Sequence, residues 1–281
     1  MKKGFKISES GTNWTATIIL VILAAILIFG PLYILFVVAL KDPADMGNVL
    51  SWPKHIRLQN FIDAWNMTNY PTKFLNTFLI TIFNLVLTIP LHAMVAYALT
   101  RKQDAIKLFK AINYLFVCSL FIPFSVMMLP LVKQASAMGI DNRWGIIILY
   151  FAFGLPMNVF LYSGQVKTLP IAIEEAARID GATPGQTFYR VIFPLMKPMS
   201  ATVAILSFMW TWNDFMMPLV VLTNPEHQTL QLAQYIFKSE FSTQYNLAFA
   251  SYVLVLVPIL VVYVFCQKWV ISGVTSGAVK S

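Results

Sequence analysis

The chain has 281 residues, of which 58% are hydrophobic and only 11% are charged, and its mean hydropathy is +0.69. A soluble domain is about 45–50% apolar, so this composition excludes a soluble protein and indicates one that is embedded in a membrane. The formal net charge of +8 requires no nucleic-acid partner, because membrane topology and anionic lipid head groups account for a basic excess.

Six apolar runs are long enough to cross a hydrocarbon core of about 30 Å as helices. The first follows MKKGFK and exceeds a signal-peptide core of about 7–15 residues, so we expect it to be retained as an anchor. Continuous runs favour helices over barrel strands, which alternate over about 10 residues. The expected spans cover residues 14–40, 74–100, 111–131, 145–162, 198–222 and 249–270.

The distribution of basic residues predicts the orientation of these spans. Six crossings place both termini on one side, and that side carries 13 of the 20 Lys and Arg residues. The positive-inside rule therefore predicts cytoplasmic termini. We expect three regions: a tail, first helix and outer loop at 1–69, a five-helix core at 70–270, and a cytoplasmic tail at 271–281.

The first predicted outer segment contains QNFIDAW, in which Phe61, Ile62 and Trp65 could cover one side of a short helix. An interfacial helix lying on the membrane and a helix that docks a receptor both fit this pattern.

Prolines interrupt four of the expected spans, at residues 90, 123, 130, 156 and 258. A proline in a membrane helix leaves one backbone carbonyl without its usual donor. A gating role and a purely architectural role remain open for each. Cys118 and Cys266 lack metal-ligand spacing and are expected to be small packing residues, so no metal site is predicted.

Asp214 is the only acid inside an expected span, in the stretch MWTWNDFMMPL. A carboxylate in hydrocarbon costs at least about 2.5 kcal/mol and favours a position facing protein or water. Together with Trp210, Trp212 and Asn213 it is a candidate for a solute path, while a place at the outer interface within an aromatic belt remains the alternative. His92 is expected to be a hydrogen-bonded packing residue rather than a proton relay.

The stretch between the fourth and fifth spans predicts an elbow of two short helices, at residues 170–194. Pro170 is expected at the start of the first helix and Gly181 as its left-handed cap. Thr183 is the expected N-cap of the second helix, with Pro184 at its first position and Pro194 as its end. Glu174 and Arg178, four residues apart, have the spacing of an intrahelical ion pair.

The alanines of the first helix suit close contact with another protein. Ala176 and Ala177 leave a helix surface without bulky side chains, so a partner's groove could approach the backbone. A short, capped helix of this kind is suited to docking in a cleft.

This segment resembles the EAA loop of permease subunits in binding-protein-dependent ABC importers. It has Glu175, Ala176 and Ala177, then three residues, Gly181, nine residues and the sequence VIFP at 191–194. The family usually has Ile and Leu where this chain has Val191 and Phe193. The stretches RWGIIILYFAFGLP, EEAARIDGATP, WNDFMMPLVVLT and GVTSGAVKS are similar to the carbohydrate-importer branch, in particular to the second maltose permease subunit.

The resemblance implies a type I importer permease that pairs with a related permease and two ATPase subunits and receives solute from an extracytoplasmic binding protein in a bacterial or archaeal membrane. It assigns ATPase coupling to Glu174, Glu175, Ala176, Ala177, Arg178, Asp180, Gly181, Val191 and Pro194. It also assigns ATPase contact to the C-terminal tail, at Gly273, Thr275, Gly277 and Lys280. The loop TLQLAQ lacks the proline often found at the corresponding position.

The chain has no G-x-x-x-x-G-K-[ST] loop, so we expect ATP and Mg²⁺ to be bound by the partner subunits, with no cofactor in this chain. An importer of a non-sugar solute is the alternative within transport. A membrane-embedded enzyme would need clustered acids or histidines, and only Asp214 and His92 are present, on separate spans. A channel or secondary transporter would show inverted repeats or several intramembrane charges.

Overall fold

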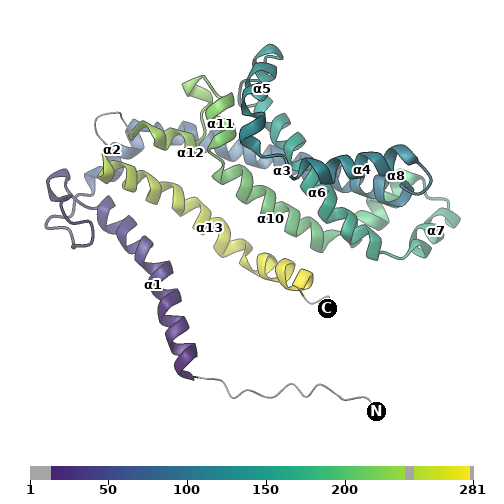
Figure 1. Ribbon diagram of the computed structural model, residues 1–281, viewed down its shortest axis with the longest axis horizontal. Coiled ribbons are helices and arrows are strands. Elements are labelled where there is room, and N and C mark those ends of the chain that lie inside the picture. Colours follow the sequence, from purple (N-terminus) through teal and green to yellow (C-terminus); the bar gives the residue numbers. More distant parts are fainter. Residues whose placement is uncertain (1–13, 238–243, 279–281) are drawn as a thin grey trace. The chain divides into compact units, whose positions relative to one another are not determined.

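The computed structural model describes residues 14–237 and 244–278, and no strand occurs in this part of the chain (Figure 1). A helix satisfies its own backbone hydrogen bonds, which a lipid-embedded segment requires. Four described helices are long and apolar enough to span a membrane, and two bent helix pairs raise the number of candidates to as many as six. The four are α1 (Trp14–Ala39), α3 (Tyr70–Lys102), α6 (Gly145–Thr168) and α13 (Tyr245–Ala278). The predicted all-helical, multi-pass membrane protein is confirmed.

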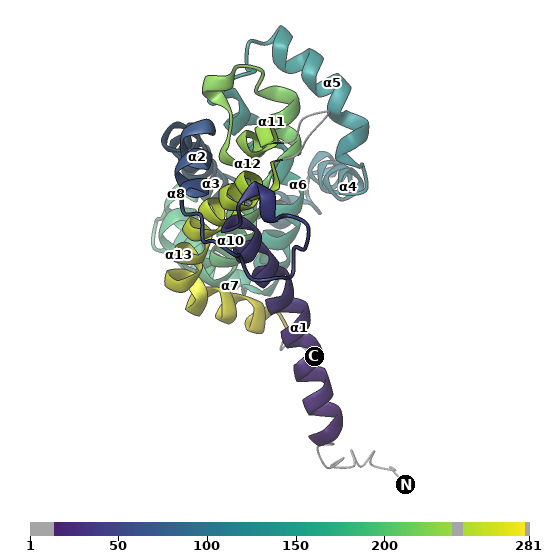
Figure 2. The ribbon, with the colours of Figure 1, turned by 90° about the vertical axis from the view of Figure 1, so that its left-hand side faces the viewer.

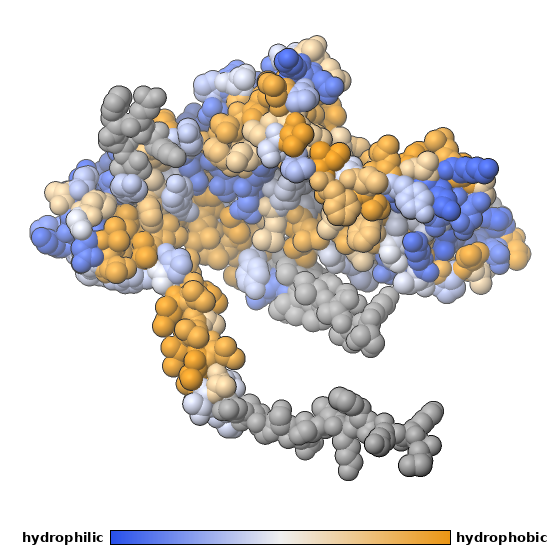
Figure 3. Space-filling view, viewed as in Figure 1, coloured by the Kyte–Doolittle hydropathy of each residue, from blue (hydrophilic) through white to orange (hydrophobic). Residues whose placement is uncertain are grey.

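The described residues divide into two compact units, the first within 14–67, 237 and 244–256 and the second within 68–236 and 257–278. In the first unit, α1 is apolar on all sides and most of its length is exposed (Figure 3), with Leu27 74% exposed. A helix that is hydrophobic all round suits contact with lipid or with another subunit. The hydrophobic core of this unit includes Ala39 of α1, Ala64, Leu247 and Ala250.

Buried polar contacts organise the loop after α1. Lys41 is completely buried, and its Nζ donates to the Asn48 carbonyl at 2.5 Å and to Ser51 Oγ at 2.9 Å. The loop contains η1 (Pro43–Asp45) and leads to α2 (Gln59–Met67). Asn60 Nδ2 donates to the carbonyls of Ala39 and Lys41, so this amide ties α2 to the end of α1.

The expected short helix at QNFIDAW is confirmed as α2. Ile62 and Trp65 are exposed on it, at 54% and 40%, while Ala64 is buried. The helix thus presents Ile62 and Trp65 outward, while Phe61 packs against the hydrophobic core of this unit, so the three side chains do not share one open face.

The second unit is built around α3, α6 and α10 (Lys197–Asn213). Ala93 of α3, Val159 and Tyr162 of α6, and Val203 of α10 belong to one fully buried cluster. Small residues on α3 let the helices approach closely, as at other membrane helix interfaces. The second and fourth expected spans are therefore confirmed as α3 and α6, both longer than predicted.

The third expected span is not one helix. It consists of α4 (Lys107–Ser119) and α5 (Phe124–Ala137), which meet at 110° (Figures 1 and 2). Pro123 is the N-cap of α5 in an extended conformation, and the missing N–H of a proline favours such a break. Pro90, Pro130 and Pro156, in contrast, lie inside continuous helices.

The fifth expected span is also interrupted. Asp214 has extended backbone angles after α10, and α11 (Met216–Val221) follows. The outer segment then forms η3 (Pro225–His227), α12 (Leu230–Ala233) and η4 (Gln234–Phe237). Lys73 Nζ donates to the Pro225 carbonyl, and Asn76 Nδ2 donates to the Glu226 carbonyl at 2.7 Å. These bonds fasten the loop to the first turns of α3.

Candidate coupling elbow and solute cavity

The first helix of the elbow, α7 (Ile171–Ile179), begins and ends as its sequence predicts, except that Pro170 is the N-cap rather than the first helical residue. Gly181 has φ +80°. Its N–H donates to the Arg178 carbonyl at 3.1 Å and that of Ala182 donates to the Ala177 carbonyl at 3.0 Å. This is a Schellman cap, which requires a left-handed residue, so the prediction for Gly181 is confirmed.

The second helix begins with a complete capping box. Thr183 Oγ1 accepts from the Gln186 N–H, and Gln186 Oε1 accepts from the Thr183 N–H at 2.8 Å. Pro184 occupies the first turn, as expected. The end of the first helix and the start of the second are therefore both fixed by local residues, and the elbow has little freedom at its corner.

Pro194 does not end the second helix. The helix continues through α8 (Pro184–Gln186), the π-helical η2 (Thr187–Ile192) and α9 (Phe193–Leu195), and α10 begins after a 77° bend. Pro194 lies at the start of α9, where the hydrogen-bond pattern changes and a missing N–H is tolerated.

Glu174 points inward rather than along α7. It is 6% exposed, and Arg101 Nε of α3 donates to its Oε1 at 2.6 Å. Tyr97 Oη donates to Oε2 at 2.7 Å. The expected pair with Arg178 is wrong, because Glu174 shares the buried face of α7 with Ala177 and meets the end of α3 there.

Arg101 also donates through Nη2 to the carbonyl of Leu169, at 2.8 Å. One guanidinium thus binds both the residue before the elbow and the acid within it. Charge-assisted bonds of this kind are about twice as strong as neutral ones. The contact attaches α7 rigidly to α3.

The opposite face of α7 is open. Ala172, Glu175, Ala176 and Ile179 are exposed, and Ile179 is 86% exposed. These positions follow a spacing of three and four residues, so they form one stripe. Hydrophilic residues gather at the end of the molecule where α7 and α8 lie (Figures 1 and 3). We call these four residues the outer stripe.

The remaining predicted coupling residues separate into two groups. Arg178 and Asp180 are exposed beside the outer stripe. Ala177 is buried, and Val191 packs against the cluster that contains Ile192. Ala177 therefore holds the elbow together, and only Ala176 of the two alanines leaves an open surface.

A cavity of about 640 Å³ lies between the end of α3, α7 and the second helix of the elbow. Its basic lining comes from Arg101, Lys102 and Arg178, and Tyr189 and Phe188 add aromatic surface. The cavity borders the buried carboxylate of Glu174.

Asp214 lies where the helix breaks between α10 and α11. Its Oδ1 accepts from the Met216 N–H, and its Oδ2 accepts from Tyr150 Oη, both at 2.9 Å. The carboxylate thus caps α11 and holds a completely buried tyrosine of α6. The structure favours an internal position over an aromatic belt at the surface.

The two neighbouring tryptophans differ. Trp210 is 39% exposed and packs edge-on against Tyr150, with ring centroids 5.2 Å apart. Trp212 is 2% exposed and packs against Phe74 and Phe208. Sequence alone does not separate these roles.

A cavity of about 390 Å³ brings Trp210 and Asp214 together. Residues at the break between α4 and α5, including Ser119 and Leu120, line its other side. Trp212 and Asn213 do not line it; Asn213 instead donates to the Met209 carbonyl at 2.9 Å. The cavity is therefore lined by residues at two helix breaks, between α4 and α5 and between α10 and α11, which the continuous apolar sequences did not predict.

A buried polar network links α3, α6 and α10 near this cavity. His92 Nδ1 and Asn158 Nδ2 are 3.1 Å apart, and Asn158 also donates to Ser207 Oγ at 3.3 Å. His92 is completely buried, which confirms it as a hydrogen-bonded packing residue. Sequence analysis missed Asn158 and Ser207, whose isolated positions in apolar runs carry no motif.

The predicted tail contacts lie at the end of α13, which continues to Ala278. The structure describes only the helical backbone at Gly273, Thr275 and Gly277, and Lys280 lies outside the described residues. The predicted Cys266 packing lies outside them as well, and Cys118 is exposed rather than buried.

The fold defines a helical, multi-pass membrane permease with a rigid, exposed elbow. Residues 64–276 match the family of binding-protein-dependent transport system inner membrane components, and the chain belongs to this family. The chain is a transport subunit and not an enzyme.

Three relatives cover nearly the whole chain. The multiple sugar-binding transport system permease protein MsmG of Streptococcus mutans is 35% identical, over 97% of this chain and 99% of the relative. The melibiose/raffinose/stachyose import permease protein MelC of Bacillus subtilis is 36% identical, over 93% and 96%. A probable starch degradation products permease, AmyC of Thermoanaerobacterium thermosulfurigenes, is 33% identical, over 92% and 94%. These matches confirm the resemblance to the carbohydrate branch.

The fold is shared with solved transporters. A bacterial ABC transporter that imports the acidic polysaccharide alginate superposes with a TM-score of 0.78 at 23% identity, covering 95% of this chain and 99% of the other. A second structure, an alginate transporter in complex with a periplasmic protein bound to alginate pentasaccharide, gives 0.70 at 15%, covering 91% and 92%.

Proposed function

We propose that this chain is one permease subunit of an ATP-driven importer for a sugar or oligosaccharide. The sugar assignment is supported by the three relatives, whose names refer to sugars or starch products. In this proposal, the bent pair of α4 and α5 forms the third span, and α10 with α11 forms the fifth span expected at residues 198–222. The basic excess supports cytoplasmic termini in a bacterial or archaeal cell.

The observation that carries the coupling proposal is the outer stripe on a helix that is fixed from behind. Glu175 and Ala176 face outward, while the Glu174 and Arg101 pair attaches the same helix to α3. A load applied to the outer stripe by an ATPase subunit would therefore be transmitted to a core helix. ATP and Mg²⁺ bind to the ATPase subunits, and this chain supplies the lever.

In this mechanism the elbow at 170–194 docks in the cleft of an ATPase subunit. Glu175 offers a carboxylate to a basic residue there, and Ala176 allows close approach. The tail at 271–281, with Gly273, Thr275, Gly277 and Lys280, adds a second contact. Closure of the ATPase pair moves the elbow, and the helices around the cavity of Trp210 and Asp214 switch from inward-facing to outward-facing.

The proposed complex contains a second related permease, two ATPase subunits and an extracytoplasmic binding protein. The helix α2 and the loop fastened to Lys73 and Asn76 are the candidate surfaces for that binding protein. Trp210, an aromatic side chain on the cavity, suits one face of a sugar ring.

The test is Glu175→Lys in the reconstituted importer, with sugar uptake, ATP hydrolysis and recovery of the ATPase subunits as readouts. Charge reversal on the outer stripe should abolish uptake and weaken ATPase recovery, because the change meets a partner rather than this chain. Asp104→Lys makes the same charge change at another exposed acid and should leave uptake near wild type. Wild-type uptake by the Glu175 variant would exclude the lever, and uptake of a non-sugar solute alone would exclude the substrate class.

A further inference from the structure

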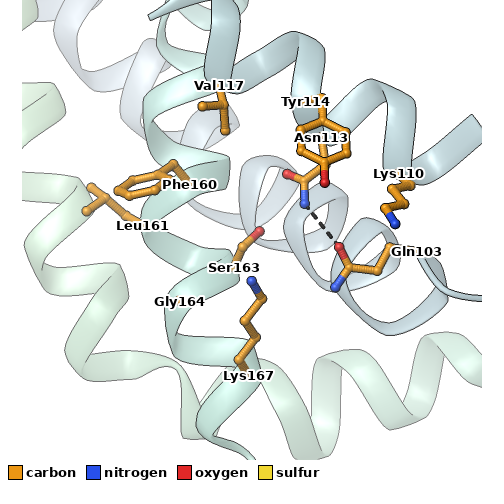
Figure 4. Close-up of a pocket in the computed structure, with 10 residues that line it drawn as sticks. All are labelled: Gln103, Lys110, Asn113, Tyr114, Val117, Phe160, Leu161, Ser163, Gly164 and Lys167. Carbon is orange, nitrogen blue, oxygen red and sulfur yellow. Dashed lines mark hydrogen bonds between the residues drawn. The ribbon is translucent and has the colours of Figure 1, made fainter.

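A second cavity, of about 460 Å³, lies between α4 and α6, and Gln103 after the end of α3 also lines it (Figure 4). Lys110 and Lys167 line one end of it, and Val117 and Phe160 line the other (Figure 4). On each helix the lysine and the apolar residue are seven residues apart, which is about 10 Å along a helix. The cavity is therefore cationic at one end and apolar at the other.

The cationic end also offers hydrogen-bond groups. Asn113 Nδ2 donates to Gln103 Oε1 at 3.4 Å, and Tyr114 lines the same cavity (Figure 4). Ser163 lines the same cavity, is 94% buried, and its hydroxyl has no hydrogen-bond partner. An unsatisfied buried hydroxyl costs about 1–3 kcal/mol unless a ligand supplies a partner.

The apolar end is open to the surroundings of the helices. Phe160 is 54% exposed and Val117 is 38% exposed. In a membrane-spanning protein such side chains face acyl chains. The neighbouring stretch from 101 to 110 holds four basic residues and one acid, so the local potential is positive.

We propose that this cavity binds one anionic phospholipid, with its phosphate between Lys110 and Lys167 and its acyl chains along Val117 and Phe160. Basic pockets between membrane helices suit anionic head groups, and the change from charge to apolar surface matches a lipid and not a soluble anion. The site lies on the same end of α3 as Arg101, so lipid occupancy would stabilise the end of the helix that holds the elbow.

The experiment titrates phosphatidylglycerol into the detergent-purified importer complex and counts retained lipids by native mass spectrometry. Lys110→Gln with Lys167→Gln removes two cationic groups and should raise the midpoint for one retained lipid roughly 30-fold. Lys102→Gln with Lys107→Gln removes the same charge from the same stretch, but neither residue lines this cavity. That control pair should shift the midpoint much less.

A second variant fills the cavity without changing its charge. A Cβ at Gly164 would meet nothing within 4 Å, so Gly164→Leu extends into open space and keeps the helix intact. It should lower lipid retention, while Gly164→Ala should retain it. Because a side chain in place of glycine favours a helix, misfolding does not explain the expected loss.

Three results would overturn the proposal. Equal shifts in the pocket pair and the control pair would indicate diffuse attraction to the basic surface. If the complex retained inorganic phosphate as well as it retained phosphatidylglycerol, the cavity would be a site for a soluble anion and not for a lipid. Loss of the second permease from the Gly164→Leu complex, with lipid retention unchanged, would show that a protein subunit covers this cavity.

Discussion

Two acids lie among the helices of the second unit, and they are held in different ways. Glu174 meets a guanidinium at 2.6 Å and a tyrosine hydroxyl at 2.7 Å. Asp214 accepts from a tyrosine hydroxyl and from the backbone N–H of Met216, both at 2.9 Å. The first arrangement neutralises the charge and fixes two helices together, while the second holds a carboxylate at a helix break through neutral donors.

The difference in how the two acids are held indicates that the elbow around Glu174 is rigid and that the helix break at Asp214 can rearrange. A buried acid with a cationic partner is costly to separate, because both charges would lose their compensation. An acid at a helix break that is held by neutral donors can exchange them for water or solute at lower cost. Rigidity at the elbow and adaptability at Asp214 suit a lever and a solute path.

Glu174→Ala should have the largest effect on stability, because it leaves the guanidinium of Arg101, whose side chain is only 15% exposed, without its acid. Removing one partner of a buried pair costs about 3–5 kcal/mol. The free energy of unfolding, measured by denaturation in detergent, should fall by about that amount, and hydrogen exchange in α7 should speed up. Glu175→Ala, the neighbouring exposed acid, is the matched control and should leave stability unchanged.

A double variant separates the charge from the packing. Glu174→Leu with Arg101→Met removes both charges, so it should recover part of the stability that Glu174→Ala loses. If either single change at Glu174 or Arg101 left unfolding and exchange unaffected, the pair would not hold the elbow.

Gly181→Val should be next in size. The φ of +80° is strained for a branched side chain by about 1–2 kcal/mol, although no atom lies within 4 Å of a new Cβ. Gly181→Asn tolerates that conformation better and should lose less. Equal stability of the Val and Asn variants would show that this corner relaxes to another conformation, contrary to a rigid elbow.

Much of the elbow was predictable because it rests on local chemistry. The Schellman glycine and the capping box are readable from a few adjacent residues. The partner of Glu174 was not predictable, because Arg101 lies 73 residues away and Arg178 has the more obvious spacing. The breaks at Pro123 and Asp214 were also missed, because an apolar run has the same composition whether its helix is continuous or bent.

Asp214→Leu should have a smaller stability cost than Glu174→Ala. It leaves the buried Tyr150 hydroxyl without an acceptor, at about 1–3 kcal/mol. Asp214→Asn keeps an acceptor and should cost less, and Tyr150→Phe should remove most of the penalty in the Leu background. If the two substitutions at Asp214 were additive with Tyr150→Phe, the bond would contribute nothing to stability.

Asp42, in the loop after α1, is an acid whose side chain is 44% exposed. Its ionisation should contribute the smallest amount to the free energy of unfolding. Its pKa lies below 3.8 because Oδ1 accepts from the Ala44 N–H and, to a smaller extent, because of Arg57. A lowered folded-state pKa adds stability above the unfolded value of 3.8, and this is lost as pH falls through the folded pKa. Because the backbone bond is the larger cause, NMR titration of Arg57→Gln should show an Asp42 pKa that is still depressed. If that pKa instead returned to its ordinary value, the Arg57 cation would be the main cause of the shift. Pairing with an arginine would then be the property that Asp42 shares with Glu174, although the two acids differ in burial.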